Sequence, residues 1–134
     1  ALIWFLRRYF PDRENLVEGI HPLKLDLDDP YYEEFFTGSD YAENYRILLQ
    51  KIREFDETIP PLINAYMNLS PTMRVFDTVS NPDFGGVEET GILIAVDEIL
   101  DEKRVRHIDS FVKEHPEALH ITSGANKLIY KDRA

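Results

Sequence analysis

The spacing of the apolar residues changes at Ser70-Pro71, and this change limits the possible folds more than any other feature. Upstream, apolar residues recur every three or four positions, which is the period of a helix with one buried face. They are Tyr41, Tyr45, Leu48, Leu49, Ile52 and Phe55 in one stretch and Leu62, Ile63, Tyr66 and Met67 in the next. Downstream, residues 73–79 and 87–96 are β-rich runs that flank turn-forming residues. The sequence therefore predicts an α+β chain in which two helices precede an antiparallel hairpin.

Both predicted helices carry signals for their ends. Asp40 with Glu43 three residues later fits a capping box, so the first helix is predicted to begin there and to run to about Phe55. Thr58 is expected to cap the second helix, which spans residues 60–69 with two prolines in its first turn.

The predicted hairpin has a long connection and a strongly apolar second strand. Residues 80–86 are turn formers, and Gly85-Gly86 is expected to take positive φ. Residues 92–96 are continuously apolar, which predicts a strand that is covered on both faces. Asp77 shares a face with apolar residues of the facing strand; a bulge or a partner donor would explain it equally well.

The first residues predict a helix that is apolar around most of its surface. Leu2, Phe5, Leu6 and Tyr9 recur at helical spacing, and Pro11 ends the pattern. Such a helix needs packing partners on most sides, and the sequence opens without an initiator Met. We therefore expect a larger protein to continue before the first residue, with this chain as its carboxy-terminal part.

The segment after this helix reads as a loop that is packed against the rest of the chain. Residues 12–38 contain several turn signals, and residues 23–27 alternate as one short half-buried strand would. Residues 31–36 hold too many aromatic side chains for a solvated linker, so we expect them to pack against the body.

The carboxy-terminal end is predicted to be the least regular part. A charged segment precedes a short helix at residues 108–114, a strand is predicted at residues 118–122, and residues 123–134 are expected to form a partly disordered tail. A chain of 134 residues is long enough for a single core, and we assign residues 1–122 to one domain.

Composition excludes several functions. The net charge of −10 would repel a polyanion, so nucleic acid is not an expected partner. Without cysteine there is no disulfide, thiolate zinc site or thiol nucleophile, and the four histidines lack metal-ligand spacing, so no metal is expected. Residues 1–6 form the longest apolar stretch, which is too short to span a bilayer. No basic region precedes it and no small-residue cleavage site follows it, so no signal peptide is predicted. A cytoplasmic location follows as the expectation.

The start of the second predicted strand carries two carboxylates. Strand side chains alternate, so only one of Glu88 and Glu89 can face a cleft, where a carboxylate could remove a proton from an amine. We assign Glu89 as the candidate base and Glu88 and Thr90 to substrate binding. The alternative, which the pattern favours, is a solvated strand end.

The end of the second predicted helix carries three further candidates. A hydroxyl at Tyr66 could protonate a departing thiolate, and Asn68 and Ser70 could hold an amide-bearing substrate. Alternatively, Tyr66 belongs to the core while Asn68 and Ser70 only terminate the helix.

A basic patch stands out in this acidic chain. Lys103, Arg104 and Arg106 could contact a phosphate or an acidic carrier protein. A solvated face that pairs with Asp101 and Glu102 is the alternative.

Residues 59–74 (IPPLINAYMNLSPTMR), 81–85 (NPDFG) and 88–94 (EETGILI) resemble the carboxy-terminal part of a bacterial family known as hemolysins. That family belongs with the N-acyltransferases that begin ornithine-lipid and glycine-lipid synthesis, and the resemblance extends from the first residue to about Lys113. It implies the GNAT (acyl-CoA N-acyltransferase) fold, with the helix at residues 60–69 and the hairpin as its last helix and last two strands.

The resemblance also implies an activity and partners. Family members move a long-chain fatty acyl group from acyl carrier protein, or from acyl-CoA, to the α-amine of an amino acid such as ornithine or glycine. The acyl thioester is a co-substrate, and no bound cofactor is implied. The expected partners are acyl carrier protein, the amino-terminal part of the same protein, a second copy in a homodimer, and the inner face of the membrane by peripheral contact.

The family's acyl-donor strand lies upstream, so this chain alone is expected to be inactive. The alternative from a different class is a non-catalytic carboxy-terminal module for interaction or structure.

Overall fold

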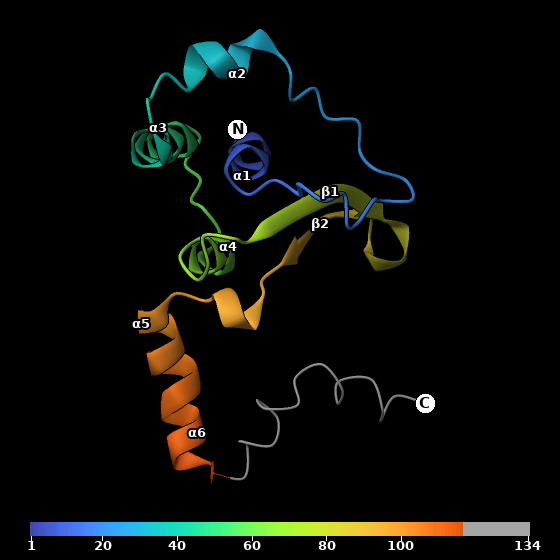
Figure 1. The fold of residues 1–134 in the computed structure, drawn as a ribbon. Coiled ribbons are helices and arrows are strands. Elements are labelled where there is room, and N and C mark those ends of the chain that lie inside the picture. The colour runs from blue at the N-terminus through green and yellow to red at the C-terminus, as the bar shows by residue number, and fades with distance from the viewer. Residues whose placement is uncertain (117–134) are drawn as a thin grey trace. The chain divides into compact units, whose positions relative to one another are not determined.

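The computed structural model in Figure 1 describes residues 1–116. These residues belong to two compact units, one of residues 1–98 and one that begins at Ile99. The first unit combines helices with a two-stranded antiparallel sheet. The predicted α+β class is therefore confirmed.

Helix α1 (Leu2–Tyr9) lies at the centre of the first unit, between the other helices and strand β1 (Figure 1). Phe5 and Leu6 are fully or almost fully buried in the core, as a helix apolar on most sides requires. The helix ends before Pro11, as predicted, and the Val75 amide donates to the carbonyl of Phe10 at 2.9 Å.

Helix α2 (Pro30–Phe35) was not predicted, because a six-residue helix is too short to show a periodic pattern. Its signals are local: the Asp29 side chain accepts from the Tyr31 amide at 2.9 Å, and Pro30 occupies the first turn. The predicted packing of this aromatic segment is confirmed, since the Trp4 ring stacks on that of Phe36 at a centroid distance of 4.4 Å.

The short strand predicted at residues 23–27 is wrong. The segment meets the sheet only at its start, where Pro22 forms an isolated bridge with Val79 and the Leu23 amide donates to the Thr78 carbonyl at 2.8 Å. The alternating leucines have no neighbouring strand with which to form a ladder, so alternation alone does not produce a strand.

Helix α3 (Tyr41–Glu54) has the predicted position, and Leu48 on its apolar face is fully buried. The Asp40 side chain accepts from the Glu43 amide at 2.8 Å, as in a capping box. The Glu43 carboxylate, however, accepts from the amide and the hydroxyl of Ser39, one residue before the expected partner.

Helix α4 (Pro61–Met67) is shorter than predicted. Its N-cap is Pro60, which makes no side-chain bond, so the predicted cap at Thr58 is wrong. The Tyr45 hydroxyl donates to the Asn64 side chain at 2.7 Å and so ties α4 to α3.

The predicted hairpin is confirmed. Strands β1 (Arg74–Asn81) and β2 (Val87–Leu93) pair antiparallel, and the 3-10 turn η1 (Pro82–Phe84) connects them. Gly85 and Gly86 take φ of 71° and 72°, which is the left-handed region predicted for them.

The expectation that residues 92–96 form a strand covered on both faces is wrong. Strand β2 ends at Leu93, which is 42% exposed, and Val96 starts the 3-10 turn η2 (Val96–Glu98) and is 62% exposed. Ile92 and Ile94 do pack against the core. The sheet of the described residues has two strands, so β2 has a free edge and only one covered face.

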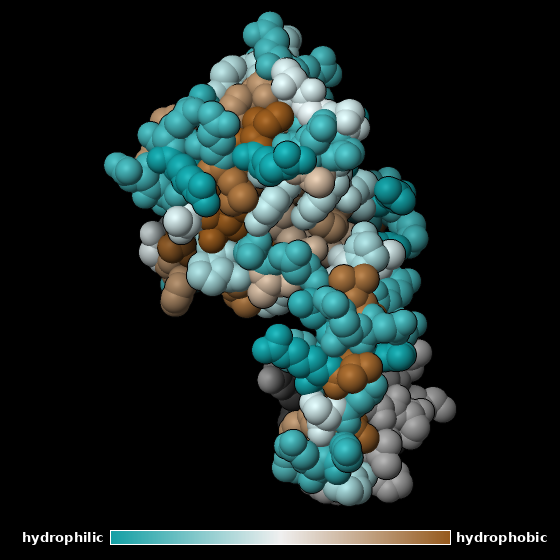
Figure 2. Space-filling model, turned by 90° about the vertical axis from the view of Figure 1, so that its left-hand side faces the viewer, coloured by the Kyte–Doolittle hydropathy of each residue, from teal (hydrophilic) through white to brown (hydrophobic). Residues whose placement is uncertain are grey.

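The second unit is helical where it is described. Helix α5 (Asp101–Arg104), the π-helical turn η3 (Val105–Asp109) and helix α6 (Ser110–Glu114) follow one another without a break. The helix thus begins seven residues before the predicted start at Ile108, with acidic residues in the first turn and basic residues after them. Apolar side chains reach its surface in separate patches (Figure 2). The predicted strand at residues 118–122 and the tail at residues 123–134 lie outside the described residues.

Candidate functional site

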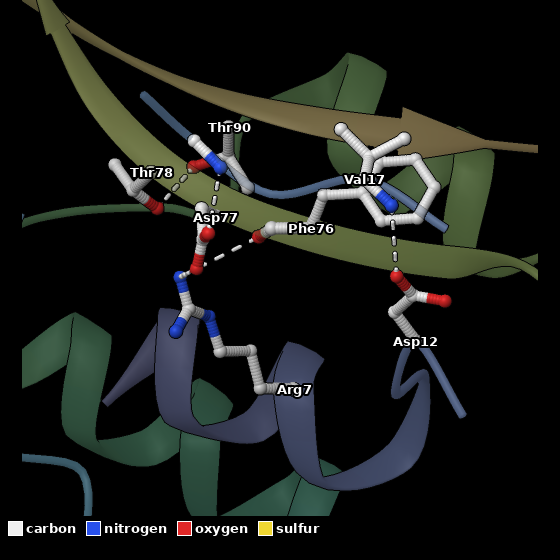
Figure 3. Close-up of polar contacts among 8 residues, drawn as sticks. Arg7, Asp12, Val17, Phe76, Asp77, Thr78 and Thr90 are labelled. Atoms are coloured by element: carbon white, nitrogen blue, oxygen red, sulfur yellow. Dashed lines mark hydrogen bonds and ion pairs between the residues drawn. The ribbon is translucent and has the colours of Figure 1, made fainter. Parts of the chain in front are cut away.

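A bulge in β1 forms the centre of the candidate site. Val75 pairs with Ile92 and Thr78 with Thr90, so β1 carries an extra residue between these pairs. The extra residue turns the Asp77 side chain toward α1, as Figure 3 shows. The sequence left a bulge or a partner donor as explanations for Asp77, and the structure contains both.

Two donors from distant parts of the chain hold Asp77. One carboxylate oxygen lies 3.4 Å from Arg7 Nη2 on α1, and the other accepts from the Gly19 amide at 2.9 Å. Residue 19 has to be small, because an added Cβ would lie 2.8 Å from the Val79 Cγ1 and 3.2 Å from the Asp77 Cβ. The segment around Gly19, just before Pro22, therefore packs directly against β1.

Asp12 and Arg7 each leave one buried atom without a partner. Asp12 Oδ2 accepts from the amides of Leu16 at 2.7 Å and Val17 at 3.3 Å, whereas Oδ1 is buried and has no hydrogen bond among the described residues. Arg7 Nε is likewise buried and has no hydrogen bond among the described residues. The contact of Arg7 Nη2 with the Phe76 carbonyl is long, at 3.5 Å. A buried polar atom without a partner typically costs about 1–3 kcal/mol, so two such atoms in one place need an explanation.

Two cavities meet at the bulge and share Val17, Phe76 and Asp77. The first has a volume of about 460 Å³, lies between α1 and β1, and adds Arg7, Pro11, Asp12, Asn15, Glu18 and Val75. The second, of about 470 Å³, lies over the hairpin and adds Gly19, Val79, Glu89, Thr90 and Gly91. The first thus contains both signs of charge, while the second is largely apolar.

A larger cavity, of about 720 Å³, lies between α1 and α2. Its acidic residues include Asp28, Asp29 and Glu33, all of which are exposed. Arg7 also lines this cavity, but Asp12, the other residue with an unpartnered buried atom, does not. The bulge therefore offers the stronger case for a site.

The structure places the predicted residues of β2 beside the second cavity. Glu89 and Thr90 line it, and the Thr90 hydroxyl lies 2.7 Å from that of Thr78. Glu89 is exposed and accepts from the Asn81 side chain at 3.1 Å. Glu88 alternates to the other face of the strand and is also exposed, so only Glu89 of the two carboxylates borders a cavity.

The predicted residues of α4 lie elsewhere. Tyr66 is half-buried and packs against the core, and the Asn68 side chain donates to the Asn64 carbonyl at 2.8 Å at the end of the helix. Ser70 is fully buried and donates to the Glu98 carbonyl at 3.0 Å. None of these predicted residues lines either of the two cavities at the bulge.

The two predicted catalytic residues, Tyr66 and Glu89, lie near opposite ends of the hairpin. Helix α4 leads into β1 at Arg74 (Figure 1), whereas Glu89 pairs with Val79, five residues along the strand. At a rise of about 3.3 Å per residue this is about 16 Å of strand. The described fold does not bring Tyr66 to the cavity that Glu89 borders.

The basic patch lies in the second unit. Lys103 Nζ is 3.5 Å from the Glu102 carboxylate, and Arg104 Nη2 is 3.2 Å from that of Asp101, while Arg106 is exposed. The pairing with neighbouring acids that the sequence offered as an alternative is therefore present for two of the three residues.

Residues 1–116 lack two further features. They contain no group of three or more His, Cys, Asp or Glu side chains arranged to hold a metal ion. No helix among them has the length and apolar character needed to cross a membrane.

Sequence reasoning missed Arg7, Asp12 and Gly19. Only Asp12 carries a local signal, because an Asp that follows a proline at a helix end often accepts from amides further along. Asp77 contacts Arg7 and Gly19 across 70 and 58 residues of sequence, and no spacing rule connects positions so far apart.

Two curated proteins are similar to this chain, and both are named glycine N(alpha)-acyltransferase. The one from Phocaeicola vulgatus is 52% identical over 130 residues, which are 97% of this chain and 40% of that protein. The one from Bacteroides thetaiotaomicron is 52% identical over 118 residues, which are 88% of this chain and 35% of that protein. The chain thus spans less than half the length of these relatives. No protein-family model matches it. No solved structure matches it either. The similarity supports a relation to an acyltransferase family.

Proposed function

We propose that the protein to which this chain belongs is an N-acyltransferase that joins a fatty acyl group to the α-amine of an amino acid, with glycine as the acceptor. The single observation that carries the proposal is the 52% identity over 97% of the chain with a protein named glycine N(alpha)-acyltransferase. Because the chain spans 40% of that relative, the proposal concerns the full-length protein.

The finer family assignment is part of the proposal. The α+β architecture, with α4 leading into the β1–β2 hairpin, is compatible with the end of a GNAT fold. The free edge of β2 is compatible with a sheet that continues in residues outside this chain. We further propose that the protein acts in bacterial aminolipid synthesis, like the hemolysin-named family that the sequence resembles.

The proposed reaction is direct acyl transfer. The neutral amine attacks the thioester carbonyl, a C–N bond forms, the C–S bond breaks, a base takes the surplus amine proton and the departing thiolate gains a proton. We propose Glu89 as the base, since it borders the cavity over the hairpin. A long acyl chain gains about 0.8 kcal/mol per buried CH₂, so it needs apolar walls such as those of this cavity.

The decisive experiment is a mass-spectrometric assay of the full-length protein with a fatty acyl carrier protein and glycine or ornithine. We expect N-acylglycine, and less product from ornithine. Heat-denatured protein is the control for non-enzymatic acylation. The proposal fails if neither amine gives an N-acyl product above this control.

The proposed roles of Tyr66 and Glu89 are tested in the same assay. If the Tyr66 hydroxyl protonates the thiolate, Tyr66→Phe lowers kcat; if Tyr66 only fills the core, kcat is unchanged. Glu89→Gln lowers kcat if this carboxylate is the base, and Glu57→Gln, at an exposed carboxylate with no proposed role, is its control. Asn68, Ser70 and Thr90 already bond within the chain, so we propose that they position the backbone near the substrate.

We propose acyl carrier protein as the donor, bound by Lys103, Arg104 and Arg106. Changing all three to Glu should raise KM for acyl carrier protein and remove the salt dependence of association. With acyl-CoA as the donor, the same variant is the control for folding and chemistry. Equal KM values for the carrier protein before and after the change would contradict this part of the proposal.

A second candidate function is a non-catalytic carboxy-terminal module. The side chains of Asn68 and Ser70 favour it, because Asn68 Nδ2 donates to the Asn64 carbonyl at the end of α4 and the Ser70 hydroxyl donates to the Glu98 carbonyl. Under this alternative the variants at Tyr66, Glu89 and the basic patch would leave kcat and both KM values of the full-length enzyme unchanged.

A further inference from the structure

We propose that the cavity between α1 and the β1 bulge is the binding site for the amino-acid acceptor, whose carboxylate contacts Arg7 and whose ammonium group contacts Asp12. This inference rests on the proposed function and deepens it, since it assigns the acceptor to particular residues. The cavity is the one of about 460 Å³ that Arg7, Asp12 and Asp77 line together.

The first argument is that the cavity holds an unpartnered donor and an unpartnered acceptor. Arg7 Nε and Asp12 Oδ1 are the two buried side-chain atoms without a hydrogen bond among the described residues, and both residues line this cavity. Each such atom lowers the stability of the empty protein. Both atoms are closed to water in the empty protein, so a ligand that supplies one acceptor and one donor satisfies them as the two side chains turn toward it.

The second argument is the way Arg7 is held. Its side chain is 27% exposed, and the contacts to Asp77 and to the Phe76 carbonyl engage only Nη2, at 3.4 and 3.5 Å. The edge formed by the other nitrogens has no partner in the described structure. A guanidinium presents its donors as a planar fork that matches a carboxylate, and Asp77 fixes the orientation of this fork without filling it.

The third argument is the way Asp12 is held. One of its oxygens accepts from two backbone amides, of Leu16 and Val17, so the carboxylate cannot rotate freely. The other oxygen is left for a cation (Figure 3). The cavity is lined by one cation, Arg7, and by the carboxylates of Asp12, Glu18 and Asp77, of which Asp77 is paired with Arg7. A zwitterion can contact Arg7 and Asp12 at the same time, whereas a simple anion would contact Arg7 and meet unfavourable charge at the carboxylates.

The position of the cavity fits the chemistry of the reaction. It shares Val17, Phe76 and Asp77 with the largely apolar cavity over the hairpin. An amino acid in the first cavity and the beginning of an acyl chain in the second would place amine and carbonyl near the bulge. Its volume lies within the usual range for small-molecule sites, about 300–1,000 Å³, and is ample for a small amino acid.

The experiment compares glycine, glycinamide and methylamine as acceptors for the full-length enzyme. The wild type should prefer glycine, because the other two amines lack the carboxylate that Arg7 would bind. Arg7→Gln should raise KM for glycine about ten- to a hundredfold, leave KM for the acyl donor unchanged, and bring the kcat/KM values of glycine and glycinamide close together. Arg8→Gln is the matched control, since Arg8 is the next residue of α1, is exposed and does not line this cavity.

Asp12→Asn tests the other end of the ligand. The Asn side-chain oxygen can still accept from the amides of Leu16 and Val17, so the turn is kept while the charge facing the cavity is lost. We expect a higher KM for all three amines with an unchanged preference among them. The exposed Asp26→Asn is the control.

A binding measurement separates these effects from catalysis. Millimolar glycine should raise the melting temperature of the wild type and of both controls, but not of Arg7→Gln or Asp12→Asn. If Arg7→Gln does not fold, Arg7→Lys keeps the charge but loses the fork, and the same loss of preference for glycine over glycinamide is expected.

Two failures can be told apart. If the wild type acylates no amine, the proposed function is wrong and this site falls with it. If the wild type acylates glycine but the Arg7 and Asp12 variants match their controls in KM, acceptor preference and thermal shift, the function stands and the site is wrong; the two buried atoms are then bridged by water alone.

Discussion

The two sides of α1 differ in whether their buried polar groups have hydrogen-bond partners. On the side of α3, Asn44 is 6% exposed and uses its whole amide: Nδ2 donates to the Tyr9 hydroxyl at 2.7 Å and to the Gly38 carbonyl at 3.2 Å, and Oδ1 accepts from the Gly38 amide at 2.9 Å. On the side of β1, Arg7 and Asp12 leave buried atoms unpartnered. A satisfied network stabilises the fold, whereas unsatisfied groups in a cavity cost stability and are typical of a site that awaits a ligand.

The aromatic rings on the α3 side of α1 pack closely, although the cavity of about 720 Å³ between α1 and α2 lies beside them. Toward α2 and α3, the Phe5 ring is fully buried, with the rings of Tyr9 and Tyr41 at centroid distances of 4.7 and 5.3 Å. Toward β1, two cavities flank the bulge. We infer that the aromatic side of α1 holds the first unit together and that the β1 side is available for binding.

The largest effect is expected for Phe5→Ala, which empties the centre of the aromatic side. Removing a fully buried phenylalanine typically costs about 3–5 kcal/mol of the free energy of unfolding. Urea unfolding of the full-length protein measures the loss. Phe55→Ala removes the same group from a site that is 70% exposed and should change stability by less than about 0.5 kcal/mol. Similar losses for the two variants would contradict the assignment of the core to this side of α1.

The next effect is expected for Asn44→Leu. It keeps the volume but leaves the Gly38 amide and carbonyl and the Tyr9 hydroxyl without their partner, at a cost of about 1–3 kcal/mol. Thermal unfolding of the full-length protein is the measurement. Gln50→Leu is the control, since Gln50 is an exposed amide on the same helix and none of its side-chain atoms has a hydrogen bond in the described fold. A variant as stable as this control would show that the network around Asn44 does not stabilise the fold.

The two sides were also unequally predictable from sequence. Helix α3, its cap at Asp40 and the hairpin follow from period and turn residues, because these signals act over a few positions. The sequence predicts the bulge at Asp77 as one of two explanations, since a charged residue on an apolar face needs either a local change of the strand or a hydrogen-bond donor.

The site itself could not be predicted, because its residues meet through the tertiary fold. Asp77 joins α1 and the segment around Gly19 only once β1 is in place. The wrong prediction of a strand covered on both faces has a related cause: an apolar run shows that burial is favourable, but it does not show which chain segment provides the cover. The sequence places Tyr66 at the end of a helix that leads into the hairpin, but it does not show how far that end lies from Glu89 in the fold.

A smaller effect, and one that depends on pH, is expected for Glu43→Gln. Hydrogen bonds from the Ser39 amide and hydroxyl lower the pKa of the Glu43 carboxyl below its ordinary value. A lowered pKa in the folded state stabilises the fold above the unfolded pKa of about 4.3, and this contribution is lost as pH falls through the folded value. The stability of the wild type relative to Glu43→Gln should therefore be greatest near neutral pH and shrink below about pH 4.3. Glu57→Gln, at another exposed carboxylate, is the control; a difference that does not change with pH would contradict the prediction.

The smallest effect on stability is expected for Arg7→Met, although the same residue is assigned the largest effect on the acceptor. The substitution removes the unpartnered Nε and fills similar space with an apolar side chain, which stabilises the fold. This gain offsets the loss of the long contact to Asp77. The Asp77 carboxylate still accepts from the Gly19 amide. The free energy of unfolding should change by less than about 1 kcal/mol, and an increase would agree best with a binding group held at a cost to the fold. Urea unfolding without amino acid measures this, and repeating it with saturating glycine should stabilise the wild type alone. A loss as large as that of Asn44→Leu would place Arg7 among the groups that stabilise the fold and would remove the distinction between the two sides of α1.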